Sequence, residues 1–305
     1  MFPAILAAFL FASTAVCATR AAILLGGVRA NFLRILLAVI ILGIWAHTLG
    51  NGFSGGSFGL FVIAGAIGFG LGGLCMFQAL PLLGSTLSLL IVECLAIVSA
   101  TLFSWVGLHA ALTLPQIIFA SLVIAGICLG IIPMTKLPGS QRMLCQGIAW
   151  ATLAAIGQGM SFTLTRLAFT QVQRSGLSLD KLTAAYQRLL GGLVVAVVVY
   201  ALFTLTRRNK LPTVPFWRGA GWKSTPWIWV SLNAILGPVL GVTCMLWAIS
   251  LVKNPGLVQA VAASATLISV PLSKPLEERS FGLNYFIGAA LALAGVAGLL
   301  LSGHH

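Results

Sequence analysis

The chain has 305 residues, of which 59% are hydrophobic and only 7% are charged. Soluble domains carry about a quarter charged residues, so this composition excludes an ordinary soluble domain and predicts a polytopic membrane protein. The formal net charge of +13 comes from 17 Lys and Arg against four acidic residues. Because most of these cations lie between apolar runs, they indicate segments that flank a membrane and face lipid headgroups, not a surface that binds nucleic acid.

Apolar runs of roughly 20 residues, the length that crosses a bilayer core, follow one another along the chain. Short connections rich in Gly, Pro, Asn and Ser separate most of them. The first run resembles a signal peptide, but no Lys or Arg precedes Arg20, so we expect a membrane helix there. The ten predicted spans cover residues 3–19, 31–49, 57–79, 84–105, 114–133, 145–169, 183–205, 226–250, 256–274 and 282–302.

The second half of the sequence repeats the first. Residues 74–83 (LCMFQALPLL) align without gaps with residues 243–252 (TCMLWAISLV), an offset of 169 residues. Upstream, the segment at Arg34 matches the segment at Arg188 with an offset of 154. We therefore predict an all-α membrane protein of ten transmembrane helices in two five-helix repeats, residues 1–137 and residues 138–305. Because five is odd, the repeats would be inverted, as in many secondary carriers.

Two stretches of the second half carry a family resemblance. PLEERSFGLNYFIGAALALAGV (275–296) has a Glu-Arg turn before a final span rich in Gly and Ala, and CMLWAISLVKNPGLVQA (244–260) has a helix that ends at a short break. With the repeat, these patterns resemble the EamA-like, ten-span branch of the drug/metabolite transporter superfamily. Members often carry a Glu followed by a Pro at this place in span four. This chain keeps the Glu as Glu93 but has Cys94 where the Pro usually stands. His109 stands where the first half would have its counterpart of Glu278.

The resemblance implies a permease for a small metabolite, such as an amino acid, or for a drug-like amine, exported across a bacterial inner membrane. It also implies that both termini lie in the cytoplasm. The charges imply the opposite orientation, because eleven of the 17 cations fall in loops after odd-numbered spans and four in loops after even-numbered spans. The positive-inside rule would place both termini outside.

Glu93 lies in the middle of the apolar run at 84–105. A charge at the bilayer centre costs several kcal/mol, so such a residue normally faces a cavity or a partner. At about 100° per residue it shares a helix face with Thr86, Ala96 and Ser104, while the opposite face is aliphatic. We expect Glu93 to pair with a cationic group or to exchange a proton; a protonated Glu bonded to a neighbouring helix is the structural alternative.

Other polar side chains at membrane depth follow the same logic, with an interhelical hydrogen bond as the alternative role of each. The glycine-rich runs at 65–73 and 288–298 predict close helix packing. The apparent lack of a central cation disfavours phosphate-bearing substrates, although Arg34 and Arg188 near the starts of spans keep that option open. The predicted substrate and coupling pathway comprises Glu93, Gln78, Gln158, Ser161, Thr243, Trp247, Gln259 and Thr266.

Together these features predict a secondary carrier that works by alternating access around a midplane site. Its expected partners are a small-molecule substrate, protons and membrane lipids, with no cofactor or metal. The sequence has no HExxH, GxSxG or Walker motif of an enzyme. Two alternatives stay open. A lipid-modifying transferase would need a His, Asp or Ser cluster at one interface, and a non-transporting assembly protein would show no stabilisation by ligands.

Overall fold

The computed structural model describes residues 2–132, 140–206, 226–273 and 282–302. Within these ranges the chain is almost entirely helical and has no strand, which confirms the all-α class. The elements are α1 (Phe2–Leu25), α2 (Gly27–Thr48), α3 (Phe58–Gly65), the π-helical η1 (Ala66–Gly72), α4 (Gly73–Leu108), α5 (Leu114–Ile131), α6 (Gln141–Arg174), α7 (Lys181–Thr206), α8 (Pro226–Ala234), the π-helical η4 (Ile235–Gly241), α9 (Val242–Leu251), α10 (Pro255–Ala262), α11 (Ala265–Ser273) and α12 (Leu283–Ser302).

Local sequence explains where several helices begin and end. Gly26, with a φ of 79°, separates α1 from α2, and only glycine adopts that conformation at little cost. Thr113 and Gln116 form a capping box at the start of α5. The side chain of Asn254 caps α10 by accepting a hydrogen bond from the backbone N–H of Gly256. These breaks lie in the connections that the sequence predicted.

Eight helical stretches of the described residues are long and apolar enough to cross a membrane, against ten predicted spans. One of them, residues 58–108, is 51 residues long, and Gly84 interrupts it with φ 77° and ψ 170°. A straight helix of that length would measure about 77 Å, more than twice a bilayer core of about 30 Å. The 34-residue α6 is not among the eight. The protein is therefore a multi-pass membrane protein, while the count of ten stays a prediction.

The predicted ninth span, 256–274, is not one continuous helix. α10 ends at Ala262 and α11 begins at Ala265, and in the turn between them the N–H of Ser264 bonds to the carbonyl of Val261. Both flanking alanines are fully buried. Irregular backbone at membrane depth is tolerated where protein encloses it, so this break lies inside the bundle, away from lipid.

The two π-helical segments occupy matching places in the two halves. η1 begins at residue 66 and η4 at residue 235, and they end at residues 72 and 241. Each pair differs by 169, the offset of the sequence repeat. Gly68 corresponds to Gly237 and Gly72 to Gly241. π-Helical turns are rare and are frequently found at functional sites.

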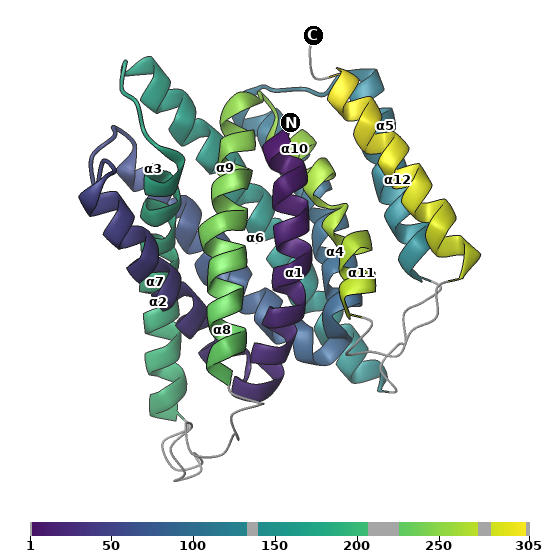
Figure 1. Cartoon of the computed structure of the whole chain (residues 1–305), viewed down its shortest axis with the longest axis horizontal. Coiled ribbons are helices and arrows are strands. Elements are labelled where there is room, and N and C mark those ends of the chain that lie inside the picture. Colours follow the sequence, from purple (N-terminus) through teal and green to yellow (C-terminus); the bar gives the residue numbers. More distant parts are fainter. Residues whose placement is uncertain (1, 133–139, 207–225, 274–281, 303–305) are drawn as a thin grey trace.

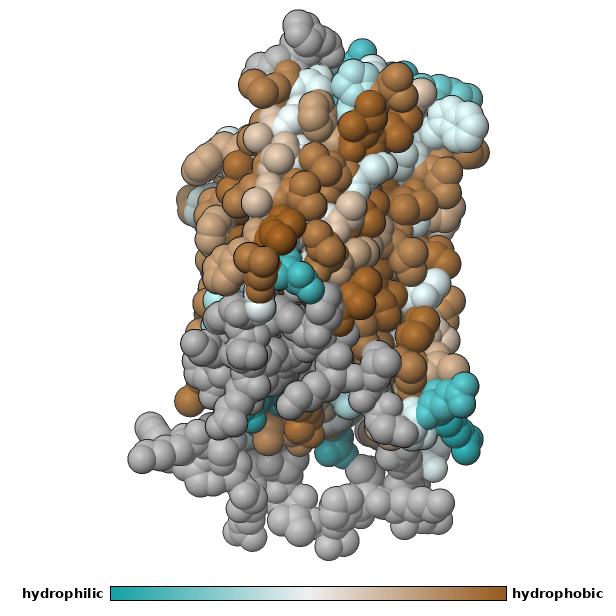
Figure 2. Space-filling model, turned by 90° about the vertical axis from the view of Figure 1, so that its right-hand side faces the viewer, coloured by the Kyte–Doolittle hydropathy of each residue, from teal (hydrophilic) through white to brown (hydrophobic). Residues whose placement is uncertain are grey.

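Matching helices of the two halves also pack together. α2 lies against α7, and α5 lies against α12 at one side of the bundle (Figure 1). A Cβ on Gly126 or on Gly288 would collide with the backbone of the facing helix, so the run at 288–298 serves close packing, as predicted. The outer face of this side is apolar over its middle height (Figure 2), as a surface that faces lipid requires.

α1 begins and α12 ends at the same end of the bundle, which is uppermost in Figure 1 and is called the upper end below. Hydrogen bonds join the two halves there. Gln187 donates through Nε2 to the carbonyls of Gly52, at 3.0 Å, and Ser54, at 2.9 Å. Asn254 donates through Nδ2 to the carbonyl of Ala110 at 2.6 Å. The upper end is therefore closed by contacts between the halves.

The structure describes only one of the two turns that the family resemblance singled out, the one at His109. The Glu-Arg turn at Glu278 and Arg279 lies outside the described residues. His109 directly follows α4 with a φ of 51°, and its backbone N–H bonds to the carbonyl of Ser104. This left-handed conformation is uncommon for a residue other than glycine, and here it ends the helix.

Candidate functional site

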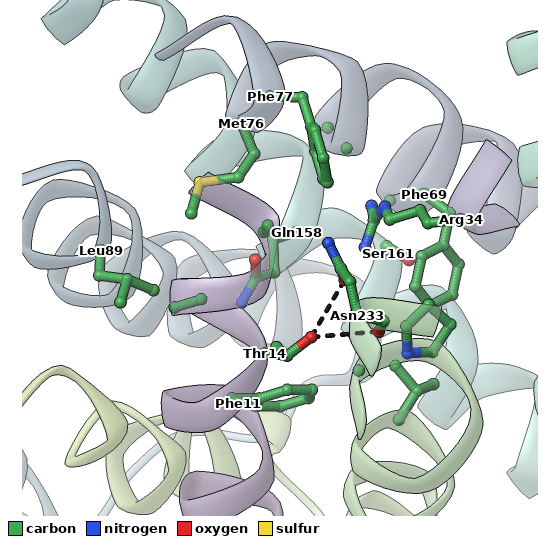
Figure 3. Close-up of a pocket in the computed structure, with 18 of the residues that line it drawn as sticks. Phe11, Thr14, Arg34, Phe69, Met76, Phe77, Leu89, Gln158, Ser161 and Asn233 are labelled. Atoms are coloured by element: carbon green, nitrogen blue, oxygen red, sulfur yellow. Dashed lines mark hydrogen bonds between the residues drawn. The ribbon is translucent and has the colours of Figure 1, made fainter. Parts of the chain in front are cut away.

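A cavity of about 150 Å³ lies inside the bundle, between helices of both halves. This is smaller than the ~300–1,000 Å³ of pockets for drug-sized ligands, so it suits a small molecule. Arg34, Gln158 and Asn233 approach it from three different helices (Figure 3). Its aromatic lining comes from Phe11, Phe69, Phe77 and Phe162, and its polar lining from Thr14, Arg34, Glu93, Gln158, Ser161, Arg188 and Asn233.

Arg188 of α7 lines the cavity with only 2% of its surface exposed. Its Nη2 donates to Ser161 Oγ at 2.7 Å, and Ser161 in turn donates to the carbonyl of Ala64. Nε and Nη1 have no hydrogen-bond partner among the described residues. The guanidinium lies 5.1 Å from the ring centre of Phe69 and 5.7 Å from that of Phe162. Burial of a cation with unpaired donors is costly, and two aromatic faces offset only part of that cost.

Arg34 reaches the same cavity from α2. Its Nε and Nη2 donate to Asn31 Oδ1 at 3.1 and 3.0 Å, and its guanidinium lies 4.6 Å from the centre of the Phe77 ring. Arg34 is thus held in place by its own helix and by α4. It adds positive charge to the cavity wall from the half of the chain opposite to Arg188.

The glycine run at 65–73 makes room for these polar groups in addition to serving helix packing. Gly65 packs against the backbone of α7, as predicted. A Cβ on Gly68 would collide with Ser161 Oγ, the acceptor of the α7 guanidinium, and a Cβ on Gly73 would lie only 2.8 Å from Nη2 of Arg34. The η1 segment and the start of α4 therefore lack side chains where the two arginines need space.

Glu93 is 5% exposed and belongs to a chain of three polar side chains. Gln259 donates through Nε2 to Glu93 Oε2, and Gln158 donates through Nε2 to Gln259 Oε1 at 3.4 Å. The chain joins α4, α6 and α10. Because Glu93 also lines the cavity, gain or loss of one proton there would change the charge of the cavity wall without movement of a helix.

Asn233 is a second residue of the wall with an unpaired donor. Thr14 donates through Oγ1 to the Asn233 carbonyl at 3.1 Å and to its Oδ1 at 3.0 Å, which joins α1 to α8. Asn233 is 1% exposed, and its Nδ2 has no partner in the part of the chain that the structure describes. Figure 3 shows this nitrogen turned away from Thr14.

Four of the eight residues of the predicted pathway meet at this site. Glu93, Gln158 and Ser161 line the cavity. Gln259 lies behind the wall and hydrogen-bonds to both Glu93 and Gln158. The structure thus joins residues of the predicted spans four, six and nine.

The other four residues of the predicted pathway lie away from the cavity wall. Gln78 lies beside the start of α2, where a Cβ on Gly27 would be 2.9 Å from its Oε1. Thr243 donates to a carbonyl of the preceding turn, and Thr266 is fully buried elsewhere. Trp247 is 48% exposed on the outside of the bundle. Val242, five residues before Trp247 in α9, lines the cavity. At about 100° per residue the two side chains lie about 140° apart around the helix, so Trp247 points away from the cavity.

The expectation of a site without a central cation is wrong. Arg34 and Arg188 follow the first residues of α2 and α7, Gly27 and Lys181, by seven positions each. At 1.5 Å per residue, each lies about 10 Å inside its helix. The spans predicted from the sequence, 31–49 and 183–205, begin closer to the arginines than the helices do. That prediction placed both arginines near the membrane surface. Arg34 and Arg188 occupy equivalent positions in the two repeats, and this symmetry was the sequence signal that could have identified them as cavity residues.

Comparison with known proteins finds a family match for somewhat less than half of the chain. Residues 1–132 match the model of the EamA-like transporter family. Over those residues, the chain is similar to members of that family. This confirms the resemblance drawn from the sequence and agrees with a membrane permease of the drug/metabolite transporter type. The matched EamA-like range ends directly after α5.

The fold of the whole chain also has a solved counterpart. A crystal structure described only as that of a protein superposes with a TM-score of 0.70 at 18% sequence identity, over 99% of this chain and 97% of the other. At that identity the likeness concerns the fold alone. No curated protein matches the chain significantly.

Proposed function

We propose that the protein is a secondary transporter that moves a small metabolite by alternating access, with the central cavity as its substrate site. The observation that carries this proposal is a cavity with charged and polar side chains in its wall, lined by helices of both halves, in a bundle closed at its upper end. The EamA-like match over residues 1–132 supports it. The expected location is a bacterial inner membrane.

We also propose ten spans in two inverted five-helix repeats, residues 1–137 and 138–305. Division of the 58–108 stretch at Gly84 raises the eight candidate spans to nine, and inclusion of α6 raises them to ten. The π-helical segments, 169 residues apart, support the repeat. In inverted repeats α2 and α7 would begin at opposite ends, so Arg34 and Arg188 would approach the cavity from opposite sides.

In this proposal the structure represents the state that opens toward the lower end. The hydrogen bonds of Gln187 to the 50–57 connection close the upper end. Arg34 lines the cavity about 10 Å from the lower end of α2, and Leu89 lines it only five residues after Gly84. The opposite state would require the Gln187 bonds to break.

Glu93 is the proposed coupling group. It is buried at the cavity wall, and the Gln158–Gln259 chain connects it to α6 and α10. A carboxyl in such a place is a candidate for proton exchange during the cycle. The Gln chain would then carry a change at Glu93 to the broken helix α10–α11, which is the kind of element that forms substrate and ion sites in carriers.

The test begins with a thermal-shift screen of the purified protein against amino acids, polyamines, sugars and cationic drugs. A hit is then assayed for flux into liposomes with and without a pH gradient. Glu93→Gln should abolish the stimulation by the gradient and preserve folding. The matched control is Asp180→Asn, because Asp180 lies outside the cavity and its Oδ1 accepts from the Thr183 N–H at 2.8 Å, a bond that Asn can keep.

Unchanged gradient-driven flux in Glu93→Gln would remove Glu93 from the mechanism. If no compound stabilises the protein and none is transported, the proposal of a transporter fails and a non-transporting assembly role takes its place.

A further inference from the structure

The charged groups of the cavity wall do not balance. Arg34 and Arg188 contribute two positive charges, and Glu93 contributes at most one negative charge. The hydrogen bonds of the two guanidiniums within the described chain go to Asn31 and Ser161, and Glu93 bonds to Gln259. The wall therefore carries a net positive charge in an apolar surrounding, where an unmatched charge is costly.

The unpaired polar atoms of the wall are donors. Nε and Nη1 of Arg188 carry three N–H groups without a partner among the described residues, and Asn233 Nδ2 is likewise unpaired there. Ser161 already gives its hydrogen to the Ala64 carbonyl. A ligand that completes this site must therefore offer acceptor atoms, and a negative charge would offset the excess positive charge.

The rest of the wall sets the shape of such a ligand. Phe69 and Phe162 flank the Arg188 guanidinium, and Phe77 and Met76 line the same space (Figure 3). With a cavity of about 150 Å³, these side chains leave room for a small apolar body beside the cationic group.

We propose that the cavity binds the carboxylate of a small organic anion with an apolar body. Arg188 holds the carboxylate through Nε or Nη1, Asn233 donates a further hydrogen bond, and Arg34 contributes positive charge. This inference rests on the proposed transport function, since it names the substrate class of the same site. It excludes drug-like amines, because a cation would meet two guanidiniums of like charge.

The experiment uses three compounds with the same aromatic body: phenylacetate, phenylacetamide and phenethylamine. The full chain is purified in detergent, and each compound is tested for its thermal shift and by equilibrium binding. Phenylacetate should stabilise the protein and bind, while the neutral amide and the cationic amine should do neither. Arg188→Gln should weaken phenylacetate binding by at least about tenfold, the loss expected for one hydrogen bond to a charged group. The exposed cation Arg174 provides the control Arg174→Gln, which should bind as the wild type does.

A second variant keeps the test decisive if Arg188→Gln does not fold. Asn233→Asp preserves the acceptor for Thr14 but replaces the free N–H donor by a carboxylate oxygen, so it should also weaken phenylacetate binding. Stabilisation by phenethylamine would overturn the inference, and so would wild-type binding of phenylacetate in both variants. Phenyl phosphate or inorganic phosphate that binds through Arg188 where phenylacetate does not would overturn the choice of a carboxylate.

The two proposals fail in different ways. Liposome flux of a neutral or cationic solute, without phenylacetate binding, would contradict the anion site but still support a transporter. Binding of phenylacetate through Arg188 without flux of any solute would support the anion site but contradict the transport function.

Discussion

Replacement of Arg188 by methionine is expected to cost the ligand-free protein little stability. The substitution removes one hydrogen bond from a charged donor, worth about 1.5–3 kcal/mol, and two ring contacts worth about 0.5–2 kcal/mol each. It also removes two buried nitrogen atoms that have no partner in the described chain, each of which costs about 1–3 kcal/mol. Ser161 keeps its bond to the Ala64 carbonyl. The opposing contributions nearly cancel, so the net change should stay within about 2 kcal/mol.

A structural role for Arg188 leads to a different expectation. Removal of one member of a buried charged network that is fully paired costs about 3–5 kcal/mol. At about 2.1 cal/mol/K of unfolding entropy per residue, 1 kcal/mol corresponds to a shift of about 1.6 °C in the unfolding midpoint of a chain of 305 residues. A structural role for Arg188 would therefore lower the midpoint by about 5–8 °C, and the account expects about 3 °C or less.

The assay is thermal unfolding in detergent of the wild type, Arg188→Met and the control Arg174→Met, each with and without phenylacetate. The account expects Arg188→Met to unfold near the wild type and to lose the stabilisation by phenylacetate. A midpoint lowered by more than about 4 °C without ligand, or a preserved phenylacetate shift, would refute the reasoning.

Three further predictions follow from the same contacts. Gln187→Ala removes two hydrogen bonds that close the upper end, each worth about 1 kcal/mol. In an Ala64→Cys background it should raise the rate of labelling by an impermeant maleimide from that side by about tenfold or more. An unchanged labelling rate would contradict closure by Gln187. Phenylacetate should bind more tightly as pH falls, because Glu93 is the acidic residue among those that line the cavity and its protonation removes a negative charge from the wall. The titratable neighbours of Glu93 on α4 and α5 are the thiols of Cys94 and Cys128. In Glu93→Gln the affinity should be independent of pH, and a pH dependence that persists would assign it to another group. Gly288→Ala should destabilise the protein by about 1–3 kcal/mol, since its Cβ would collide with the backbone of α5, whereas Gly59→Ala, which has open space around it, should not; equal unfolding midpoints of the two variants would contradict the close α5–α12 contact.

Much of the fold could be predicted from the sequence because apolar runs and their breakers act locally. The breaks at Gly26, Thr113 and Asn254 lie where the residues themselves end or cap a helix. The small and polar face of Glu93 points inward, since Thr86 and Ser104 are buried, while Leu102 on the opposite face is 51% exposed. Periodicity predicts this orientation because a regular helix connects these positions.

The rest depends on features that periodicity does not contain. The alignment of Trp247 with Gln78 suggested a site, but neither residue lines the cavity. An alignment of repeats shows which positions correspond, not which face of a helix meets the cavity, and Trp247 is on an outer face. The hydropathy-based spans begin later than α2 and α7 do. They therefore did not show how far Arg34 and Arg188 lie from the helix starts. The unpaired donors of Arg188 depend on which groups other helices bring to it, and no local pattern encodes that.

The most direct test of the central claim is uptake of radiolabelled phenylacetate into liposomes that contain the protein, with protein-free liposomes as the measure of passive leak. The account expects uptake above the leak for the wild type and Arg174→Gln, loss of that uptake in Arg188→Gln, and loss of its stimulation by a pH gradient in Glu93→Gln. Uptake by Arg188→Gln equal to that of the wild type would contradict transport of an anion through this cavity.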